Sequence, residues 1–489
     1  MMQFEPTKDP AADILLSFYE FGIPRTPKTK DKTIKYHEII GGNLKEEVVA
    51  MLKTGTQQRR LLVQGLTYAG TTPNPQNVIG SVNAYLPSVW KIQKSLQASK
   101  DTLIKLQKPL LFTWHSVLTP PGEDNTLTQS VFIFEVSMII VVRALSHYNA
   151  AQIEVQRALQ NQNNVSNMNA MFKNAVTELR NGAGVLDFVA KYLQNWKKPP
   201  KNPLPEVNRR ILVGLQNYFL CQAQRILTAK AIMDKQYVIV PQLLGGLQQR
   251  YSTCINYLKS GQQIVPDIVQ ECVLMVHVCE SFAHRYAASN LRDKIDSGKI
   301  VDDLETNFGN SVAHVIVANS KFNINWSGLG NIRKRYEGKC SQVKQILVEM
   351  ETEFQETNAG VYFGPVDMEE ATLPTRSQHK FLPQPIEFNV PAVEALSFQQ
   401  VPRAPPGIEQ KAFEQMPVDI QNELWAQHNA TVEAAKAAEL EAKNGAKKSK
   451  KKKKKGKEPE LPPGYDRATF NELPPDLQKE ILAEYQRNK

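Results

Sequence analysis

Helical spacing of apolar residues, sustained from about residue 44 to residue 356, is the strongest constraint on the fold of this chain. In the runs Leu103–Leu111, Ile211–Phe219 and Val269–Cys279, apolar side chains recur every three or four residues. Strand signals are confined to the first 40 residues, where segment 33–40 favours pairing with a neighbouring segment. The sequence therefore predicts a mainly α-helical body with a small N-terminal β element.

Three breaks divide this helical stretch. They fall at Thr119–Gly122 (Thr-Pro-Pro-Gly), in the Asn- and Gln-rich segment Gln160–Asn169, and at Lys197–Pro203. The helices between them are expected to be antiparallel and roughly 20 to 35 residues long, above the average for globular proteins. Such lengths favour an elongated, curved bundle or solenoid over a compact sphere.

The sequence changes character after Thr352. Between residues 353 and 410 the chain has eight prolines, at positions 365, 374, 383, 385, 391, 402, 405 and 406. They exclude long helices and predict an extended strap that lies along the body. Farther on, Ala430–Lys443 is rich in Ala, Glu and Lys and predicts a partly formed helix. Lys447–Lys457 is of low complexity and is expected to be solvated, in a largely disordered tail.

Charge and cysteine content limit the class of protein. The formal net charge is +10, but residues 443–457 contain ten lysines and no acidic residue, so the rest of the chain is formally neutral. The basic character therefore belongs to one tract and does not indicate a nucleic-acid-binding domain face. The five cysteines form no Cys-x-x-Cys pair, which favours reduced thiols in a cytosolic helical core.

Neither a membrane span nor a secretory signal is expected. Ser130–Leu145 is the best candidate for a span, but Glu135 and Arg143 interrupt it. The first nine residues lack the basic-then-apolar pattern of a signal peptide.

No catalytic or metal-binding motif occurs in the sequence. It contains no nucleotide-binding glycine loop, no His-Glu-x-x-His, no Gly-x-Ser-x-Gly and no zinc-ligand spacing. A cysteine hydrolase built from Cys272, Cys279 and His277 lacks any nucleophile signature, and His277 is expected to be a packed core residue. We therefore expect no catalytic residues, no cofactor and no bound metal, and hence a protein that is not an enzyme.

A segment of the tail occurs twice. Phe413–Ala426 returns as Phe470–Ala483 at an offset of 57 residues, with Phe, Pro, Asp, Gln, Glu and Ala in register. Each copy is too short to bury a core, which points to a docking motif used twice. A proline near the first helical position and an aspartate in the first turn favour a helix start in both copies.

Each copy places apolar residues on one side of a helix of about ten residues. The shared phrase Leu-Pro-x-Asp-(Ile/Leu)-Gln-x-Glu-(Ile/Leu) is similar to the ubiquitin-binding motif of translesion polymerases. In that family, the Leu-Pro pair and the following apolar positions contact the hydrophobic patch of ubiquitin. The resemblance implies ubiquitin contacts in the second copy by Leu473, Pro474, Leu477 and Ile481, and in the first copy, where methionine replaces leucine, by Met416, Pro417, Ile420 and Leu424. The alternative is that both helices pack on the body or bind an unrelated groove.

Three stretches of the body resemble the Bro-one domain of Alix-type proteins. They are Leu111-Phe-Thr-Trp-His115 followed by Ser130–Ala144, the segment Leu220-Cys-Gln-Ala-Gln-Arg-Ile-Leu227, and the exit segment Asn358–Pro374. Order, spacing and length agree over roughly residues 10–390. The resemblance implies a curved helical body around a tetratricopeptide-like core. It also implies a partner, the C-terminal amphipathic helix of an ESCRT-III subunit, bound in an apolar groove.

Carried over by alignment, the family's groove falls on Leu227, Val240 and Leu244. Val240 and Leu244 are one helical turn apart and share a face, although ordinary core positions are the alternative. Pro241 would kink this helix or mark its start. Tyr362 aligns with a tyrosine of the family's exit strap and is a candidate for phosphorylation or packing. Acidic residues that the family places after its Phe-Asn helix are replaced by Gln160–Asn167.

The predicted organisation has five parts: a Bro-one-like domain at 1–390, a Pro-rich linker at 391–411, a first ubiquitin-binding-like motif at 412–428, an Ala/Glu/Lys helix with a poly-Lys linker at 429–468, and a second motif at 469–486. These parts predict a cytoplasmic, non-enzymatic adaptor of endosomal sorting, recruited to endosomes. Its body would bind ESCRT-III, and its tail would bind ubiquitin or ubiquitinated cargo.

The lysine tract Lys447–Lys457 leaves three roles open. It is a solvated spacer, a segment attracted to an anionic membrane surface, or a nuclear-localisation or nucleic-acid-binding signal. No aromatic residue interrupts the tract, so base stacking and a specific nucleic-acid partner are not expected. The alternative function is a nuclear ubiquitin-reading scaffold directed by this tract.

Overall fold

The computed structural model divides the chain into two compact units, Met1–Gln400 and Val401–Lys489. It describes residues 9–26, 34–41, 44–66, 73–99, 105–120, 122–123, 125–259, 264–373, 382–396, 398, 404–409, 412–413, 416–453, 464, 466, 470, 478–479, 481 and 483–484.

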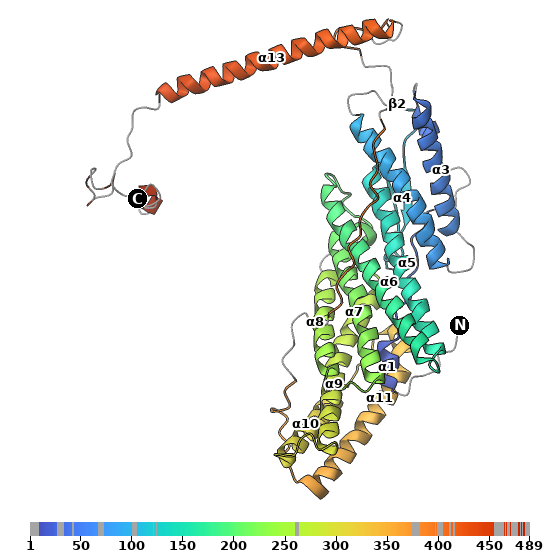
Figure 1. Ribbon diagram of the computed structural model, residues 1–489, viewed down its shortest axis with the longest axis vertical. Helices are drawn as coiled ribbons and strands as arrows, with labels where there is room; N and C mark the ends of the chain where they lie inside the picture. Colours follow the sequence, from blue (N-terminus) through green and yellow to red (C-terminus); the bar gives the residue numbers. More distant parts are fainter. Residues whose placement is uncertain are drawn as a thin grey trace. The chain divides into compact units, whose positions relative to one another are not determined.

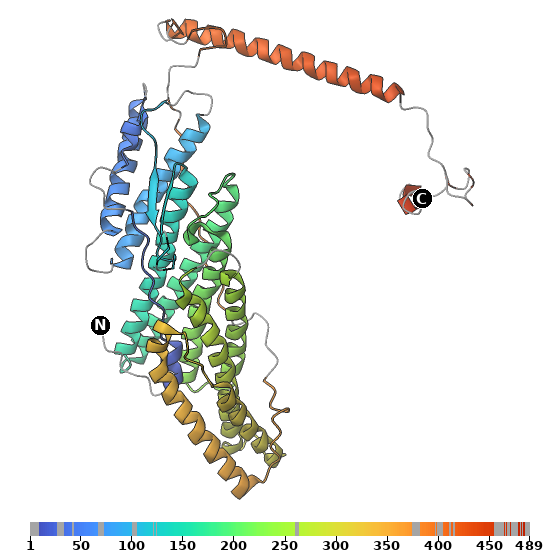
Figure 2. The same cartoon turned by 180° about the vertical axis from the view of Figure 1, so that it is seen from behind.

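Long helices build the first unit, as the apolar spacing predicts (Figures 1 and 2). Consecutive members from α5 to α10 pack side by side. The long helices are α3 (Glu46–Leu66), α4 (Pro75–Ala98), α5 (Phe132–Gln160), α6 (Val165–Tyr192), α7 (Arg209–Met233), α8 (Val240–Lys259), α9 (Pro266–Asp296), α10 (Leu304–Lys321) and α11 (Gly330–Thr357). The short elements are α1 (Pro10–Leu15), α2 (Tyr36–Ile39), the 3₁₀ turns η1 (Leu193–Asn195) and η2 (Pro205–Val207), and the π-helical turn η3 (Asn358–Tyr362).

Asparagine side chains start several of these helices. Asn74 accepts hydrogen bonds from two backbone N–H groups at the start of α4, and Asn208 does the same for α7. Asn164 accepts one at the start of α6. Such caps satisfy N–H groups that have no partner within the helix. The predicted break at Gln160–Asn169 is therefore shorter than expected, because α6 already begins at Val165.

The strands correct the prediction for the region before α5. β1 (Ile40–Gly41) pairs antiparallel with β2 (Lys105–Leu106), and β3 (Phe112–His115) pairs antiparallel with β4 (Thr126–Gln129). Strands are thus not confined to the first 40 residues, and Leu103–Leu111 is not helical where it is described. Pro109 disfavours a helix at this point, and the aromatic and Thr residues of β3 favour a strand. Segment 33–40 pairs only at Ile40, because Tyr36–Ile39 forms α2.

Helix α5 lies in the core of the body. By length and composition it could cross a membrane, with a mean hydropathy of 1.2, but 89% of that apolar window is buried inside the protein. Glu135, which interrupts the apolar run, accepts hydrogen bonds from Arg59 Nε (2.8 Å) and Trp114 Nε1 (2.7 Å). A third comes from the Tyr85 hydroxyl (3.0 Å). The buried charge is therefore paired, and it ties α3, α4 and β3 to α5.

The predicted strap is present in residues 382–396. Its backbone exchanges hydrogen bonds with Arg180 of α6, from Arg180 Nε to Gln384 O (2.7 Å) and from the Ile386 N–H to Arg180 O (3.0 Å). A Cβ atom at Gly184 would lie 1.7 Å from Ile386 O, so the close approach of the strap to α6 requires glycine. The extended segment is thereby fixed to the helical body.

The second unit contains one long helix, α13 (Val418–Lys453). The sequence predicts a helix of about ten residues in the first motif and, separately, a partly formed helix over Ala430–Lys443; the structure has one continuous helix. The helix extends farther in both directions and begins directly after Pro417. The first turns of α13 are therefore the helical part of the first tail motif.

Candidate functional site

The first tail motif folds into a turn followed by a helix, and Gln421 holds the two together. The side-chain amide of Gln421 donates hydrogen bonds to the carbonyl oxygens of Phe413 and Met416, each at 2.9 Å. The Met416 N–H donates to Phe413 O (3.2 Å), and the Gln421 N–H donates to Pro417 O (3.0 Å). Phe413 is fully buried and Gln421 is 5% exposed. Two of the residues repeated between the copies are therefore internal anchors.

The predicted ubiquitin contacts of this copy lie on its outer surface. Ile420 is 42% exposed and Pro417 is exposed. Met416 and Leu424 are half-buried. Separation of buried anchors from exposed apolar residues is the arrangement that a helical docking motif requires.

The second copy shares the anchor geometry in its described residues. The Phe470 N–H donates to Asp466 O at 3.0 Å, matching the bond from Phe413 to Glu409 O at 3.0 Å. Phe470 is buried, as Phe413 is. Ile481 is half-buried. The other predicted contacts of this copy, Leu473, Pro474 and Leu477, lie outside the described residues.

The three residues assigned to the ESCRT-III groove have different environments. Leu227 on α7 is 39% exposed, but Val240 and Leu244 on α8 have no exposed surface. In this conformation the two residues of α8 belong to the core, because the helix packs against both α7 and α9. Val238, just before α8, is 59% exposed. Of the three predicted groove residues, only Leu227 is therefore accessible to a partner in this conformation, and Val240 and Leu244 are not.

Pro241 does not kink α8. It is the second residue of the helix, where a missing N–H costs nothing, so it marks the start of the helix. The buried apolar residues of α8 form one stripe along the helix, at spacings of three and four: Val240, Leu243, Leu244, Leu247 and Tyr251. This spacing is typical of a helix whose apolar face packs on the core, which agrees with the alternative that Val240 and Leu244 are ordinary core positions.

Tyr362 ends the π-helical turn η3 and packs on the body. Its ring stacks on Phe308 of α10, with centroids 4.2 Å apart and planes at 16°. The packing role is therefore present, and phosphorylation stays a prediction.

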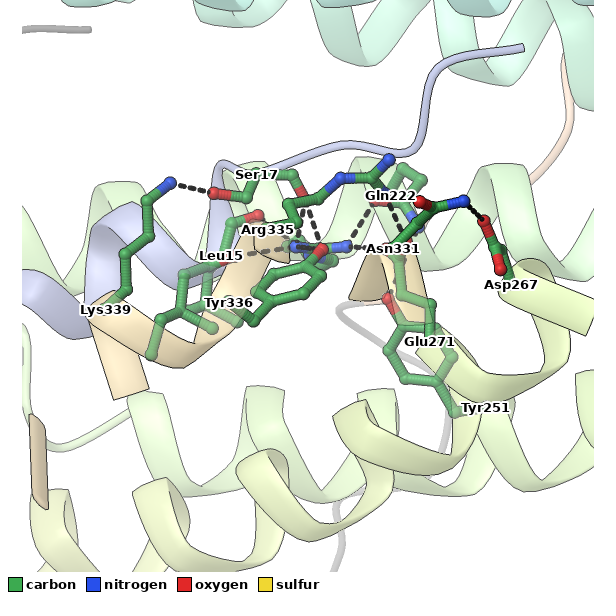
Figure 3. A network of polar contacts seen from close by, with 12 residues as sticks. Leu15, Ser17, Gln222, Tyr251, Asp267, Glu271, Asn331, Arg335, Tyr336 and Lys339 are labelled. Atoms are coloured by element: carbon green, nitrogen blue, oxygen red, sulfur yellow. Dashed lines mark hydrogen bonds and ion pairs between the residues drawn. The ribbon is translucent and has the colours of Figure 1, made fainter. Parts of the chain in front are cut away.

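Sequence reasoning missed a buried polar network centred on Arg225. The guanidinium donates to the backbone oxygens of Ile14 (2.7 Å) and Leu15 (2.8 Å), at the end of α1. It also donates to Glu271 Oε1 of α9 (2.7 Å), and both side chains have no exposed surface. Figure 3 shows further partners, including Gln222 and Tyr336. The Arg225–Glu271 pair at its centre has no exposed surface, so the network's evident role is to fix the N-terminal segment to the body.

The cysteines and His277 do not form a nucleophilic site. All five cysteines are buried and unbridged. Burial raises the pKa of Cys279 and raises that of Cys340 to about 12, which disfavours the thiolate. His277 is exposed on α9, so the prediction that it packs in the core is wrong: the core side of this helix is formed by residues such as Cys272 and Met275. Within the described ranges, no three His, Cys, Asp or Glu side chains gather where they could hold a metal ion.

Helical body, buried N-terminal segment and exit strap together define a protein of the BRO1-like class. The BRO1-like domain model matches residues 94–422, and the chain belongs to that family. A second model, described as a ubiquitin binding region, matches residues 458–489 and so includes the second tail motif.

Solved structures share the fold at low sequence identity. The structure titled "ALIX BRO1 CHMP4C complex" aligns with 76% of this chain and 96% of its own, at 14% identity and a TM-score of 0.56. A crystal structure of ALIX in complex with the SIVmac239 PYKEVTEDL late domain aligns with 88% of this chain and 56% of its own, at 13% identity and a TM-score of 0.58. A third structure, titled "Structure basis for endosomal targeting by the Bro1 domain", aligns with 78% of this chain and 92% of its own, at 14% identity and a TM-score of 0.51. No curated protein sequence matches the chain.

Proposed function

We propose that this protein is a non-enzymatic adaptor that links ubiquitinated cargo to ESCRT-III in endosomal sorting. The observation that carries the proposal is the presence of two kinds of binding module in one chain, a BRO1-like domain over residues 94–422 and a ubiquitin-binding region over residues 458–489. Proteins with BRO1 domains act as scaffolds or adaptors, and the endosomal-targeting structure supports recruitment from the cytoplasm to endosomes.

The partner of the body is proposed to be the C-terminal amphipathic helix of an ESCRT-III subunit. The ALIX BRO1 domain in complex with CHMP4C supports this class of partner. Exposed apolar side chains at Leu227 and Val238 supply the kind of surface that the apolar face of such a helix covers. The loop after α5 lacks acidic residues, so basic positions of the partner helix gain no ion pair there.

The partner of the tail is proposed to be ubiquitin. Pro417 and Ile420 are already exposed in the first copy, and the second copy has leucine in place of Met416. Two weak sites in one chain favour multivalent ubiquitinated cargo, because the second contact is intramolecular once the first has formed. Helix α13 begins within the first motif and is 36 residues long, which corresponds to a rod of about 54 Å. This rod replaces much of the flexible spacer that the sequence suggests.

The lysine tract is proposed to strengthen recruitment to anionic membrane. Each lysine near such a surface contributes about 1 kcal/mol. A nuclear ubiquitin reader directed by the same tract is the competing function. Fluorescence imaging of the full chain, with Lys447–Lys457 intact or with its lysines changed to Gln, separates them: loss of endosomal puncta supports the membrane role, and loss of nuclear enrichment supports the alternative.

Titration of labelled monoubiquitin and diubiquitin tests the tail. The full chain is compared with Leu473→Ala/Pro474→Ala, with Met416→Ala/Pro417→Ala and with both pairs combined. We expect dissociation constants on the order of 100 μM for monoubiquitin, tighter binding of diubiquitin, and loss of both in the combined variant. Retention of ubiquitin binding in the combined variant would contradict the proposed contacts.

A matched pair of surface variants tests the body. Leu227→Asp places a charge in the proposed groove, whereas Val301→Asp changes a side chain that is 69% exposed in the loop before α10. Binding of an ESCRT-III C-terminal peptide should fall for Leu227→Asp and stay unchanged for Val301→Asp. Equal binding by both variants would remove Leu227 from the site.

A further inference from the structure

A surface cavity lies between the loop after α10 and the middle of α11, and none of the predicted site residues lines it. Its volume is about 560 Å³, within the range of sites that enclose a small ligand or a short peptide segment. Apolar side chains contribute part of its wall, including Phe322, Trp326 and Val348. Val348 is 43% exposed although it is apolar. No acidic side chain lines the cavity.

Lys344 gives the cavity a positive charge. Its ammonium group donates to two neutral acceptors, Asn319 O (2.8 Å) and Asn323 Oδ1 (3.1 Å). No carboxylate of a described residue lies within ion-pair distance, whereas Arg333 and Arg335 of the same helix each pair with a glutamate. An ammonium group has three donors, so one remains for a ligand. A half-buried cation without a counter-charge favours an anionic group in the cavity.

The rim of the cavity offers main-chain partners. Residues Asn323–Asn325 form no backbone–backbone hydrogen bond within the part of the chain that the structure describes. Exposure alternates along the segment, with Asn323 and Asn325 exposed and Ile324 and Trp326 half-buried. Alternation with a period of two is the pattern of an extended chain. An extended segment with unpaired N–H and C=O groups can pair with another extended chain.

We propose that this cavity binds a short, extended peptide segment of another protein in which an acidic side chain neighbours an apolar one. The carboxylate would meet Lys344, the apolar side chain would rest on Trp326 and Val348, and the peptide backbone would pair with Asn323–Asn325. The lining of the site includes no residue of the tail motifs and does not include Leu227, so the site neither requires nor replaces the proposed ubiquitin and ESCRT-III contacts.

A fluorescence titration of the full chain tests the site. The probe is an N-acetylated, C-terminally amidated hexapeptide of alternating Glu and Leu, and its control has Gln at every Glu position. The lysines of Lys447–Lys457 are changed to Gln in every variant, because that tract attracts acidic peptides without forming a site. We expect a saturable change in tryptophan emission that disappears in Trp326→Phe, and binding at least fivefold weaker for the Gln peptide.

Variants of α11 separate a built site from general charge attraction. Lys344→Met should weaken binding of the Glu peptide at least fivefold. Lys334→Met, at an exposed position of the same helix, should leave that binding unchanged. Because Lys344 also holds the rim through Asn323, Val348→Glu provides a second variant, which places a like charge at an exposed position. Non-saturable binding, equal binding of both peptides, or unchanged binding in both Lys344→Met and Val348→Glu would overturn the proposal.

Discussion

Arg225 and Glu271 form an ion pair with no exposed surface, with Nη1 and Oε1 2.7 Å apart, at the point where α7, α9 and α1 meet. The pair does more than neutralise two charges. The remaining guanidinium donors reach the last carbonyls of α1, Leu15 O and Ile14 O, the second of which also accepts from the Ser17 N–H just past the helix. Glu271 is shared with Arg335 of α11 through its other oxygen at 3.1 Å. One buried cation thus joins the first described helix to three others.

Replacing Arg225 should therefore destabilise the body and release its N-terminal segment. Arg225→Met has a side chain of similar length without the charge. It removes the guanidinium donors from Leu15 O and Ile14 O, leaving Ile14 O with the Ser17 N–H, and leaves Glu271 paired with Arg335 alone. We expect a loss of about 3 to 5 kcal/mol in the free energy of unfolding, measured by denaturant titration, and faster proteolysis near residues 17–26.

The matched control is Arg333→Met. Arg333 also pairs with a glutamate, but at the surface of α11. Exposed pairs contribute little, so this variant should unfold at the denaturant concentration of the unchanged protein. A similar effect of both substitutions would show that the buried network has no special role.

Stability should fall with acid between about pH 6.5 and pH 4 because of two facing histidines. His284 of α9 and His314 of α10 lie with their Nδ1 atoms 2.9 Å apart. Burial lowers the pKa of each to about 4; Lys321 lowers that of His284 further while Glu280 opposes it. The folded state keeps both rings neutral, whereas the unfolded chain protonates them below pH 6.5. Acid therefore favours the unfolded chain in this window.

We expect a loss of roughly 2 kcal/mol for each ring, or about 4 kcal/mol for the pair, between pH 6.5 and pH 4.5, measured as the shift of the urea midpoint. In His284→Gln/His314→Gln, the free energy of unfolding should depend less on pH in this window. It should still fall at lower pH, where carboxylates such as Glu178 are protonated. Glu178 contributes there because its hydrogen bond to His147, working against burial, leaves its pKa below the ordinary value. An unchanged slope in the double variant would refute the assignment.

Features encoded by local periodicity and by runs of residues could be predicted from the sequence. The helical spacing of apolar residues in Ile211–Phe219 predicts the buried face of α7. The prolines after Thr352 predict the extended strap. The stretch around Leu220–Leu227 identified the family although the solved structures are only 13–14% identical. In the tail, recurrence at a fixed offset found the motif without any structure.

Features that depend on distant partners could not be predicted in this way. Arg225 meets carbonyls some 210 residues earlier in the chain, and nothing in the flanking sequence marks that contact. Val240 and Leu244 share a face, as predicted, but the covering of α8 by two helices decides that the face is buried. Strand β2 was missed because the apolar residues at 103–111 also fit a helical period, and short apolar runs are compatible with both helix and strand.

Phe363 should be replaceable by glycine without loss of stability. Its backbone is left-handed, with φ 55° and ψ 26°, and its side chain is 73% exposed. A left-handed residue other than glycine costs about 1 to 2 kcal/mol. Phe363→Gly removes this cost and little packing, so we expect the free energy of unfolding to stay equal or rise by up to about 1 kcal/mol. Val361→Gly is the control: it is 64% exposed but lies within η3, and it should lower stability. A destabilised Phe363→Gly would show that the phenyl ring is needed.

Gln421 should control how well the first tail motif is organised before it meets ubiquitin. Its amide bonds to Phe413 O and Met416 O hold Pro417 and Ile420 at the start of α13. Gln421→Ala removes two hydrogen bonds worth about 1 kcal/mol each. Measured in a chain that also carries Leu473→Ala/Pro474→Ala, it should weaken monoubiquitin binding roughly tenfold. Gln421→Glu should do the same, because a carboxylate would face two carbonyl oxygens.

The free chain distinguishes positioning from direct contact. If Gln421 positions the motif, backbone amide exchange at residues 416–421 should become faster in Gln421→Ala without ubiquitin, because the turn then opens more often. Gln427→Ala, at an exposed position of α13, should change neither exchange there nor affinity. Weaker binding with unchanged exchange would instead mean that Gln421 touches ubiquitin itself, and that the buried amide seen here is released when ubiquitin binds.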